Sequence, residues 1–300
     1  MQFSIIITSY NQREFIKDAV DSALSAAAGA AEVIVVDDAS TDGSQELLRT
    51  YGEAIRLVCR ELNGGAGAAR NCGAAVATGD YLVFLDGDDL FFPWAMEVYR
   101  SVVERKTPKM ILGSMRWFRG DRPAACAPHA PQSVHIVDYP DYMRKDRPFG
   151  NSASVLVIDR RAFLRVRGWM QDMFPMDDQD LSIRLGDSGR TVQVLSPDTV
   201  QRREHSANTV HDVALFLPRL ACMLERERRG EYPGGSMRRF DRYGLLGGLV
   251  FFWFKRAFRC GLYGEAVALL LRGWRMLAIA IARRGSSHLT GRRPCETIEI

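Results

Sequence analysis

The first two hundred residues alternate short apolar runs with stretches of helical period. The apolar runs are rich in β-branched side chains, which is typical of buried strands. Between them, apolar residues recur every three to five positions, as at Phe15, Ala19 and Leu24, which predicts helices. We expect strands at Phe3–Ile7, Glu32–Val36, Ile55–Cys59 and Tyr81–Leu85, and helices at Glu14–Ala28, Gln45–Tyr51 and Ala66–Ala77.

After Pro93 the pattern is less regular, and from Val210 onward helical periodicity dominates. The earlier alternation predicts an α/β domain, residues 1–209, whose mostly parallel sheet is covered by helices on both faces. Residues 210–300 are expected to form a helical extension. Further helices are expected at Trp94–Arg105, Arg160–Val166 and Asp177–Leu185, strands at Lys109–Phe118, Ser154–Ile158, Val192–Leu195 and Thr199–Arg203, and a loop at Arg119–Ser133.

Composition is that of a globular protein, with 47% apolar and 25% charged residues, which excludes a disordered chain. The net charge of +4 is unevenly distributed along the chain. Residues 1–200 carry 22 Lys and Arg and 27 Asp and Glu, whereas residues 201–300 carry 18 Lys and Arg and 9 Asp and Glu. Residues 238–284 interleave Arg with Leu, Phe and Trp, a pattern that predicts peripheral membrane contact. A helical subdomain packed on the α/β domain or on a second chain is the alternative. Nucleic-acid binding is not expected, because no nucleic-acid module accompanies the charge.

The six cysteines form no Cys-x-x-Cys pair, which indicates reduced thiols. No basic stretch precedes the first apolar run, so a secretory signal is not expected. The longest apolar or glycine run, Gly244–Phe254, is shorter than the roughly 20 residues of a spanning helix. We expect a cytoplasmic protein, with attachment to the inner face of the cytoplasmic membrane left open.

Polar segments follow three of the expected strands, at Thr8–Asn11, Asp37–Asp38 and Asp86–Asp89. Ligands of open α/β sheets bind outside the carboxyl ends of the strands, so we expect these segments to meet in one crevice. In the third segment two Asp residues flank Gly87, which permits close approach of a ligand. Such paired carboxylates are costly to hold together without a cation, and their oxygens suit Mg²⁺ or Mn²⁺. A solvated acidic turn is the alternative.

A glycine-rich segment, Asn63–Asn71, opens an expected helix. It follows the third strand, and Arg70 stands where a dinucleotide fingerprint has a final Gly or Ala, so nicotinamide binding is not expected. Glycines that open a helix leave backbone N–H groups able to face an anion, and Arg70 could add a phosphate contact. Close packing of a small-residue helix on the sheet is the alternative.

Four ordered segments, Ile5–Asn11, Val35–Ser44, Ala69–Gly73 and Phe84–Asp89, together resemble the family 2 glycosyltransferases. The resemblance implies the GT-A fold, a Rossmann-like mixed sheet with helices on both faces, and a nucleotide-diphosphate sugar as donor, with a UDP-sugar favoured. It divides residues 1–209 into a nucleotide-sugar-binding half, residues 1–92, and an acceptor half, residues 93–209.

The resemblance also implies roles for the matching residues. Asp38 would hydrogen-bond the nucleotide base, and Asp37 would support the strand end or the ribose. Asp86 and Asp88 match the family's Asp-x-Asp, with Asp88 the main ligand of Mn²⁺ or Mg²⁺. The implied donor-binding set is Thr8, Tyr10, Asp37, Asp38, Asn63, Arg70, Asp86, Gly87 and Asp88.

Two later segments resemble further motifs of the family. Asp177–Leu181 looks like the acidic pair followed by Asp-Leu of inverting members, which implies that Asp178 is the catalytic base. Capping of the helix by these carboxylates is the alternative. Arg203–Asn208 is similar to the segment whose histidine, here His205, can approach the metal or the diphosphate.

These features predict an inverting, metal-dependent glycosyltransferase that acts on a saccharide or lipid-linked saccharide in surface polysaccharide or lipopolysaccharide synthesis. One alternative is a nucleotidyltransferase that makes sugar nucleotides, but Thr8–Gln12 lacks the Gly-rich basic loop that such enzymes place after the first strand. The other is a non-catalytic nucleotide-sugar-binding protein, against which the intact Asp86, Asp88 and Asp178 argue.

Overall fold

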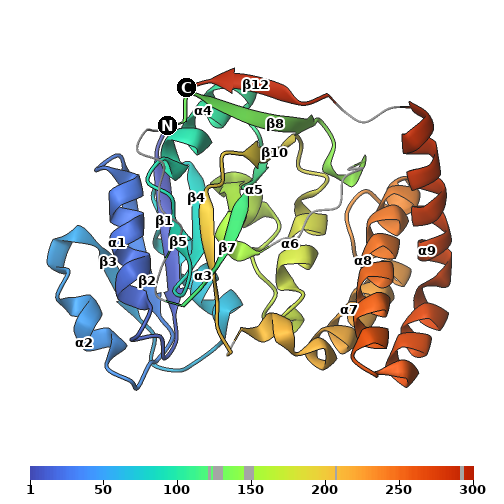
Figure 1. Ribbon diagram of the computed structural model, residues 1–300, viewed down its shortest axis with the longest axis horizontal. Helices are drawn as coiled ribbons and strands as arrows, with labels where there is room; N and C mark the ends of the chain where they lie inside the picture. Colours follow the sequence, from blue (N-terminus) through green and yellow to red (C-terminus); the bar gives the residue numbers. More distant parts are fainter. Residues whose placement is uncertain (121–122, 124–130, 145–151, 207, 291–293) are drawn as a thin grey trace.

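The computed structural model describes residues 1–120, 123, 131–144, 152–206, 208–290 and 294–300, with the backbone alone for 285–290. Figure 1 shows a large sheet with helices on both faces and a group of long helices at one end of the molecule. The helices are α1 (Ile16–Ala27), α2 (Ser44–Arg49), α3 (Ala66–Val76), α4 (Ala95–Lys106), α5 (Arg160–Arg165), α6 (Asp177–Leu185), α7 (Val213–Arg228), α8 (Arg239–Arg259) and α9 (Tyr263–Thr290).

The strands form two sheets. Among the described residues, nine strands lie in the order β12-β8-β10-β6-β9-β4-β1-β2-β3, and three in the order β5-β11-β7. Neighbours from β4 to β3 are parallel, whereas β9 runs antiparallel to both β4 and β6, so the larger sheet is mixed. The strands are β1 (Phe3–Ser9), β2 (Ala31–Asp37), β3 (Arg56–Cys59), β4 (Tyr81–Asp86), β5 (Leu90–Phe91), β6 (Met110–Leu112), β7 (Met115–Arg119), β8 (Ser133–Tyr139), β9 (Leu156–Asp159), β10 (Thr191–Ser196), β11 (Val200–Glu204) and β12 (Glu296–Glu299).

The central strand β1 separates two cores, because successive side chains of a strand point to opposite faces. Ile5 and Ile7 belong to the core that includes α1 and α4. Ile6 belongs to the core that includes α3, α5 and α6. All three side chains are fully buried, so both faces of the sheet are covered, as the sequence predicted.

Two expectations about strands were wrong. The range Lys109–Phe118 is two strands, because the chain leaves the larger sheet at Gly113 and β7 joins the smaller sheet beside β11. A Cβ at Gly113 would lie 2.6 Å from the Tyr99 hydroxyl, so a side chain does not fit where the chain changes sheets. The extension after Val210 is also not wholly helical, since β12 pairs antiparallel with β8. Most of the loop expected at Arg119–Ser133 lies outside the described residues.

The three long helices α7, α8 and α9 share a core of their own, which also contains Met173, Met176 and Ile183 from around α6. This extension therefore packs directly on the helix that carries Asp177 and Asp178. No helix in the described part of the chain combines the length and the apolar character needed to cross a bilayer.

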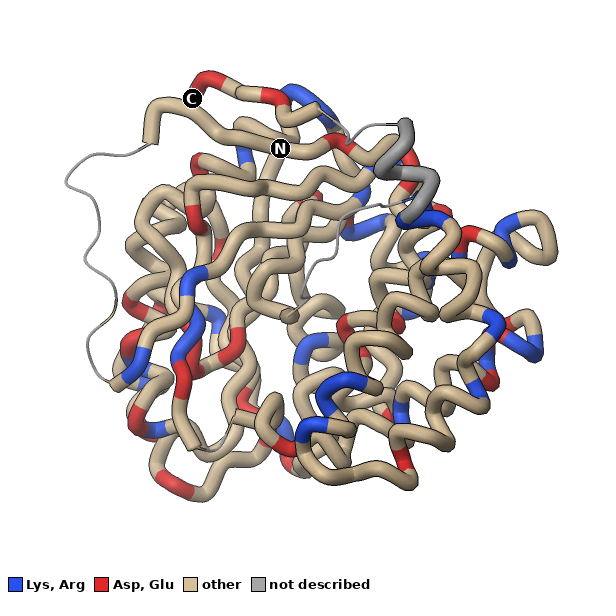
Figure 2. Tube along the Cα trace, turned by 45° about the vertical axis from the view of Figure 1, so that its right-hand side comes forward, with Lys and Arg blue, Asp and Glu red and all other residues tan. Residues whose placement is uncertain are grey.

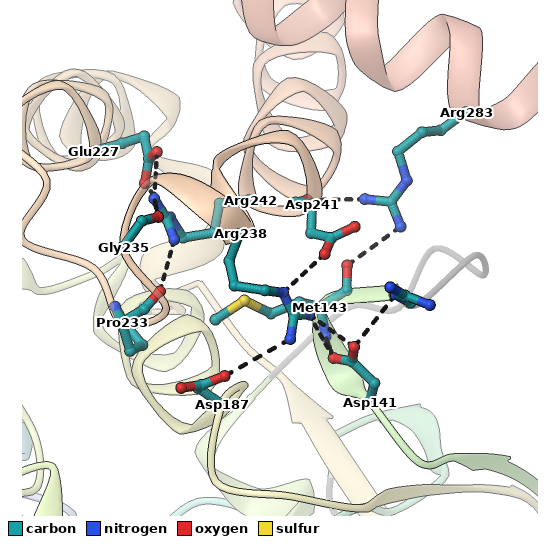
Figure 3. A network of polar contacts seen from close by, with 11 residues as sticks. Asp141, Met143, Asp187, Glu227, Pro233, Gly235, Arg238, Asp241, Arg242 and Arg283 are labelled. Carbon is teal, nitrogen blue, oxygen red and sulfur yellow. Dashed lines mark hydrogen bonds and ion pairs between the residues drawn. The ribbon is translucent and has the colours of Figure 1, made fainter.

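Ion pairs at the start of α8 attach the extension to the rest of the molecule (Figure 3). Arg238 contacts Asp141 in the turn after β8 (2.7 Å) and Asp187 after α6 (3.7 Å). Within the extension, Arg242 and Glu227 are fully buried and form two hydrogen bonds, at 2.6 and 3.0 Å. Glu227 is thus a buried charge that depends on a single guanidinium for its compensation.

We expect Arg242→Met to lower the free energy of unfolding by about 3–5 kcal/mol, because it leaves the Glu227 carboxylate buried without its partner. Urea unfolding at neutral pH measures the loss. Arg239→Met, at an exposed position on the same helix, is the matched control and should stay within about 0.5 kcal/mol of the wild type. Equal losses for the two variants would contradict the assignment.

Candidate active site

The carboxyl ends of β4, β1 and β2 lie side by side, because these strands are parallel neighbours. Their loops are tied together: the Asn11 N–H donates to the Ser40 hydroxyl, and the Thr41 N–H donates to Asn11 Oδ1, both at 2.9 Å. Thr8 at the end of β1 is buried, and Tyr10 is half exposed. The polar segments predicted to meet at this edge of the sheet therefore do meet.

The two carboxylates at the end of β2 have different protein partners. Asp37 Oδ1 accepts hydrogen bonds from the Ser40 N–H (2.9 Å) and the Gln45 side chain (2.7 Å), so it supports the turn into α2. Asp38 is buried and forms an ion pair with Arg60. The carboxylate that was expected to hydrogen-bond a nucleotide base thus already has a cationic partner, and its contact with a base stays a prediction.

The glycine-rich segment before α3 closes onto Asp38. The N–H groups of Gly64 and Gly65 donate to Asp38 Oδ2 at 3.1 and 2.7 Å, and Asn63 Oδ1 accepts a second bond from the Gly65 N–H at 3.0 Å. Gly65 has a φ of +82°, which a glycine adopts without strain. The anion that the N–H groups of Gly64 and Gly65 face in this structure is thus a carboxylate of the protein itself.

Arg70 on α3 is buried and joins two distant parts of the chain. It donates to Asp86 Oδ1 at 2.7 Å and to Asp177 Oδ2 at 3.2 Å, and its guanidinium lies 4.6 Å from the centre of the Trp169 ring. Burial alone would lower the pKa of Arg70, but the carboxylates of Asp86, Asp178 and Asp177 raise it above its ordinary value. Arg70 therefore stays charged and holds α6 against the end of β4.

Asp178 lies in the first turn of α6, next to the carboxylate that pairs with Arg70. The N-cap of α6 is Met176, so neither Asp177 nor Asp178 caps this helix. Asp178 Oδ1 is enclosed and has no hydrogen-bond partner among the described residues. Desolvation by this enclosure, with Asp177 and Asp86 nearby, raises the pKa of Asp178 to about 8. A carboxyl group with such a pKa changes its protonation state close to neutral pH, which is the range in which a catalytic acid or base works.

Asp180, also on α6, is fully buried and anchors the helix to the extension. Its Oδ1 accepts hydrogen bonds from Arg226 (2.9 Å) and from the Tyr232 hydroxyl (2.8 Å), and its Oδ2 accepts one from Arg184 (2.6 Å). Two of these partners lie 46 and 52 positions away in the sequence, so no local pattern could have revealed the role.

Asp86, Asp88 and Asp89 form an acidic cluster in which one carboxylate oxygen of each lies within 4.8 Å of the others. Asp89 is buried and accepts hydrogen bonds from the Ser154 hydroxyl (2.6 Å) and the Arg203 N–H (3.1 Å). Burial and the neighbouring Asp88 and Asp86 raise the pKa of Asp89 well above its ordinary value. Asp89 thus fixes the loop, while Asp86 and Asp88 are less buried and border the site.

His205 lies beside this cluster, as expected from the sequence. Its Nε2 is 2.9 Å from Asp88 Oδ2, and its ring stacks on Phe15 with the ring centres 4.9 Å apart. Carboxylate oxygens together with an imidazole nitrogen can hold a divalent cation, so the side chains present fit such an ion. Arg203 was not among the expected site residues, yet its Nε donates to the Asp88 carbonyl oxygen at 3.2 Å and so orients the cluster.

Gly87 is needed for a reason other than ligand approach. Its N–H donates to the Thr8 carbonyl oxygen at 3.0 Å, and a Cβ at Gly87 would lie 2.7 Å from that oxygen. The absence of a side chain therefore lets the end of β4 turn closely over the end of β1.

The model of the family described as glycosyl transferase family 2 matches residues 4–155, which is half of the chain. The chain belongs to glycosyl transferase family 2. The match covers the ends of β1, β2 and β4 and the start of α3, where the residues expected to bind the donor lie, and ends before α6 and His205.

Several curated relatives of this family 2 member come from bacteria. TuaG of Bacillus subtilis, a glycosyltransferase assigned to teichuronic acid biosynthesis, is 36% identical over 139 residues, which are 45% of this chain and 55% of TuaG. The Bacillus subtilis glycosyltransferase EpsE is 29% identical over 62% of this chain and 67% of its own length. The chain thus matches about half the length of TuaG, and 34% of the Rickettsia prowazekii glycosyltransferase RP339.

Solved structures share the fold of this family 2 member at low sequence identity. Residues 1–349 of S. aureus TarS in complex with UDP-GlcNAc superpose with a TM-score of 0.67 at 15% identity, over 97% of this chain and 93% of that one. The mannosyltransferase PcManGT from Pyrobaculum calidifontis, in complex with GDP-Man and Mn²⁺, gives 0.58 at 19% identity, over 97% and 76%. The chain therefore has the GT-A fold that the sequence predicted.

The raised pKa of Asp178 predicts how stability depends on pH in the protein without added metal. Folded Asp178 keeps its proton up to about pH 8, whereas the unfolded carboxyl loses it near pH 3.9. The folded state thus binds more protons between these values, so stability should fall as the pH rises through this window. One such group contributes at most about 1.4 kcal/mol per pH unit to the free energy of unfolding.

Asp178→Asn should remove this part of the slope, as measured by urea unfolding at steps between pH 5 and 8. A slope as steep in Asp178→Asn as in the wild type would show that Asp178 does not hold a proton in the folded state.

Proposed function

We propose that the chain is an inverting, metal-dependent glycosyltransferase that moves a sugar from a nucleotide diphosphate to a hydroxyl group. The observation that carries this proposal is the Arg70 bridge, which brings the base candidate Asp178 on α6 into the same site as Asp86 at the end of β4. A cation-binding cluster and a proton acceptor in one site are the two aids that this reaction requires.

Asp88, Asp86 and His205 are the residues that would hold Mn²⁺ or Mg²⁺, since an oxygen of Asp86 lies within 4.8 Å of one of Asp88, and His205 Nε2 lies 2.9 Å from Asp88 Oδ2. A divalent ion bound there would stabilise negative charge on the departing diphosphate. The protein's own part is to hold these ligands in place, through Arg70 on Asp86 and through Arg203 on the backbone of Asp88.

Asp178 is proposed to take the proton of the acceptor hydroxyl. The acceptor oxygen then forms a bond to the anomeric carbon as the bond from that carbon to the diphosphate oxygen breaks. A single displacement inverts the anomeric centre and needs no carboxylate nucleophile. Asp177 remains paired with Arg70, which leaves Asp178 as the carboxylate of this pair with an oxygen that makes no hydrogen bond in the described structure.

The donor is proposed to be a nucleotide-diphosphate sugar, with a UDP-sugar favoured because TarS binds UDP-GlcNAc on the same fold. Thr8, Tyr10, Asp37, Asp38 and Asn63 line the donor side in this proposal. The acceptor is proposed to be a saccharide or lipid-linked saccharide of a cell-surface polysaccharide, in line with the teichuronic acid assignment of TuaG. The division into a donor half, residues 1–92, an acceptor half, residues 93–209, and an extension stays a prediction.

Asp88→Ala is expected to abolish Mn²⁺-dependent turnover, because it removes the ligand that faces His205. A panel of nucleotide sugars, with and without Mn²⁺ and scored by release of the nucleoside diphosphate, measures this. Asp172→Ala, which removes an exposed carboxylate outside the cluster, is the control and should keep wild-type turnover. Full activity of Asp88→Ala in a metal chelator would refute the assignment of the metal site.

Asp178→Asn is expected to lower kcat by about 10²–10⁴-fold, the range that general-base catalysis contributes, and to leave donor affinity nearly unchanged. Calorimetric titration of the donor and steady-state kinetics on the same preparation separate the two effects. A variant that loses donor binding instead would assign Asp178 a structural role. Donor binding without turnover in the wild type, unchanged in the variant, would indicate a non-catalytic binding protein.

A further inference from the structure

The outer face of α9 carries a stripe of exposed apolar side chains. Tyr263, Val267, Leu271, Trp274 and Ile281 recur at helical spacing, and each is more than half exposed, with Leu271 at 72%. From the first to the last of them the helix rises about 27 Å. Phe258 at the end of α8 extends this stripe, since its exposed ring lies 5.0 Å from that of Tyr263.

Packing within the described part of the chain does not account for this stripe. The opposite face of α9, with Ala266, Leu269, Met276 and Ala280, is buried, and α9 packs against α8 and α7. The helices α8 and α9 approach so closely that a Cβ at Gly273 would lie 2.6 Å from the side chain of Val250. The buried face of α9 thus already attaches the helix to its neighbours. The apolar side chains on its outer face take no part in that packing.

Basic residues border the stripe. From Arg239 to Arg284 the sequence has nine Arg and Lys residues and two acidic ones, Asp241 and Glu265. Arg242 is buried against Glu227, and six of the basic residues are exposed: Arg239, Lys255, Arg259, Arg272, Arg275 and Arg284. Figure 2 marks these charges along the trace of α8 and α9. The Arg275 guanidinium lies 5.3 Å from the centre of the Trp274 ring, so charge and apolar surface meet on one face.

We propose that this face of α9, with the end of α8, binds peripherally to an anionic lipid surface. Large apolar side chains bordered by Arg are what an interfacial helix needs, because the former enter the acyl boundary while the latter meet lipid phosphates. The absence of a spanning helix among the described residues fits a helix that lies in the plane of the interface. A second copy of the chain is a poorer occupant, because pairing two such faces would bring their Arg residues together with few acidic partners.

Flotation of the full chain with vesicles tests this proposal, using phosphatidylcholine alone and an equal mixture with phosphatidylglycerol. We expect at least about tenfold tighter binding to the anionic vesicles, weakened by high salt. Replacing Leu271 and Trp274 together by Glu should weaken binding at least tenfold. Both side chains are exposed, so circular dichroism and donor turnover without lipid should match the wild type.

Leu164→Glu on α5 is the control, because Leu164 is exposed to a similar degree and lies outside the stripe; it should bind vesicles as the wild type does. Binding that is equal for the double variant and the wild type would overturn the proposal. The proposal would also be overturned if the wild type did not bind vesicles and light scattering showed a dimeric wild type and a monomeric double variant. That result would assign the stripe to contact with a second copy of the chain.

Discussion

A buried guanidinium is the constraint on which the site depends. Removing Arg70 from water is costly unless carboxylates compensate its charge, and Asp86 and Asp177 do so from elements that are far apart in the sequence. The same pairing fixes the distance between the end of β4 and the start of α6. Each carboxylate would in turn be an uncompensated charge without Arg70, so the three residues stabilise one arrangement.

Asp177 and Asp178 differ in the groups that offset their negative charge. Asp177 shares the guanidinium, whereas Asp178 is enclosed beside two other acidic groups with one oxygen unpaired in the described structure. Desolvation and these acidic neighbours outweigh the nearby Arg70 and Arg202, so Asp178 holds its proton more tightly than an ordinary carboxyl group. Adjacent residues of one helical turn are therefore divided by their surroundings into an ion-pair member and a group with a raised pKa.

Local sequence patterns were sufficient for β1, β2, β3 and β4, which are short apolar runs, and for the polar segments that follow β1, β2 and β4. They failed where structure depends on distant partners. The strand β12 is a strand because it pairs with β8, and Asp180 is an anchor because Arg226 and Tyr232 reach it from the extension. Gly64 and Gly65 matched a phosphate-binding pattern, but which anion their N–H groups meet depends on the position of Asp38.

The pairing of β12 with β8 attaches the end of the extension to the larger sheet. The chain leaves the α/β domain after β11 and returns to the larger sheet at Glu296–Glu299. The segment that contains α7, α8 and α9 therefore lies between two strands that both belong to sheets of the α/β domain. Asp180 on α6 and the strand β8 thus both hold the extension to the α/β domain. A fluorescent label placed next to β12 would accordingly report on the rim of the sheet rather than on the helices.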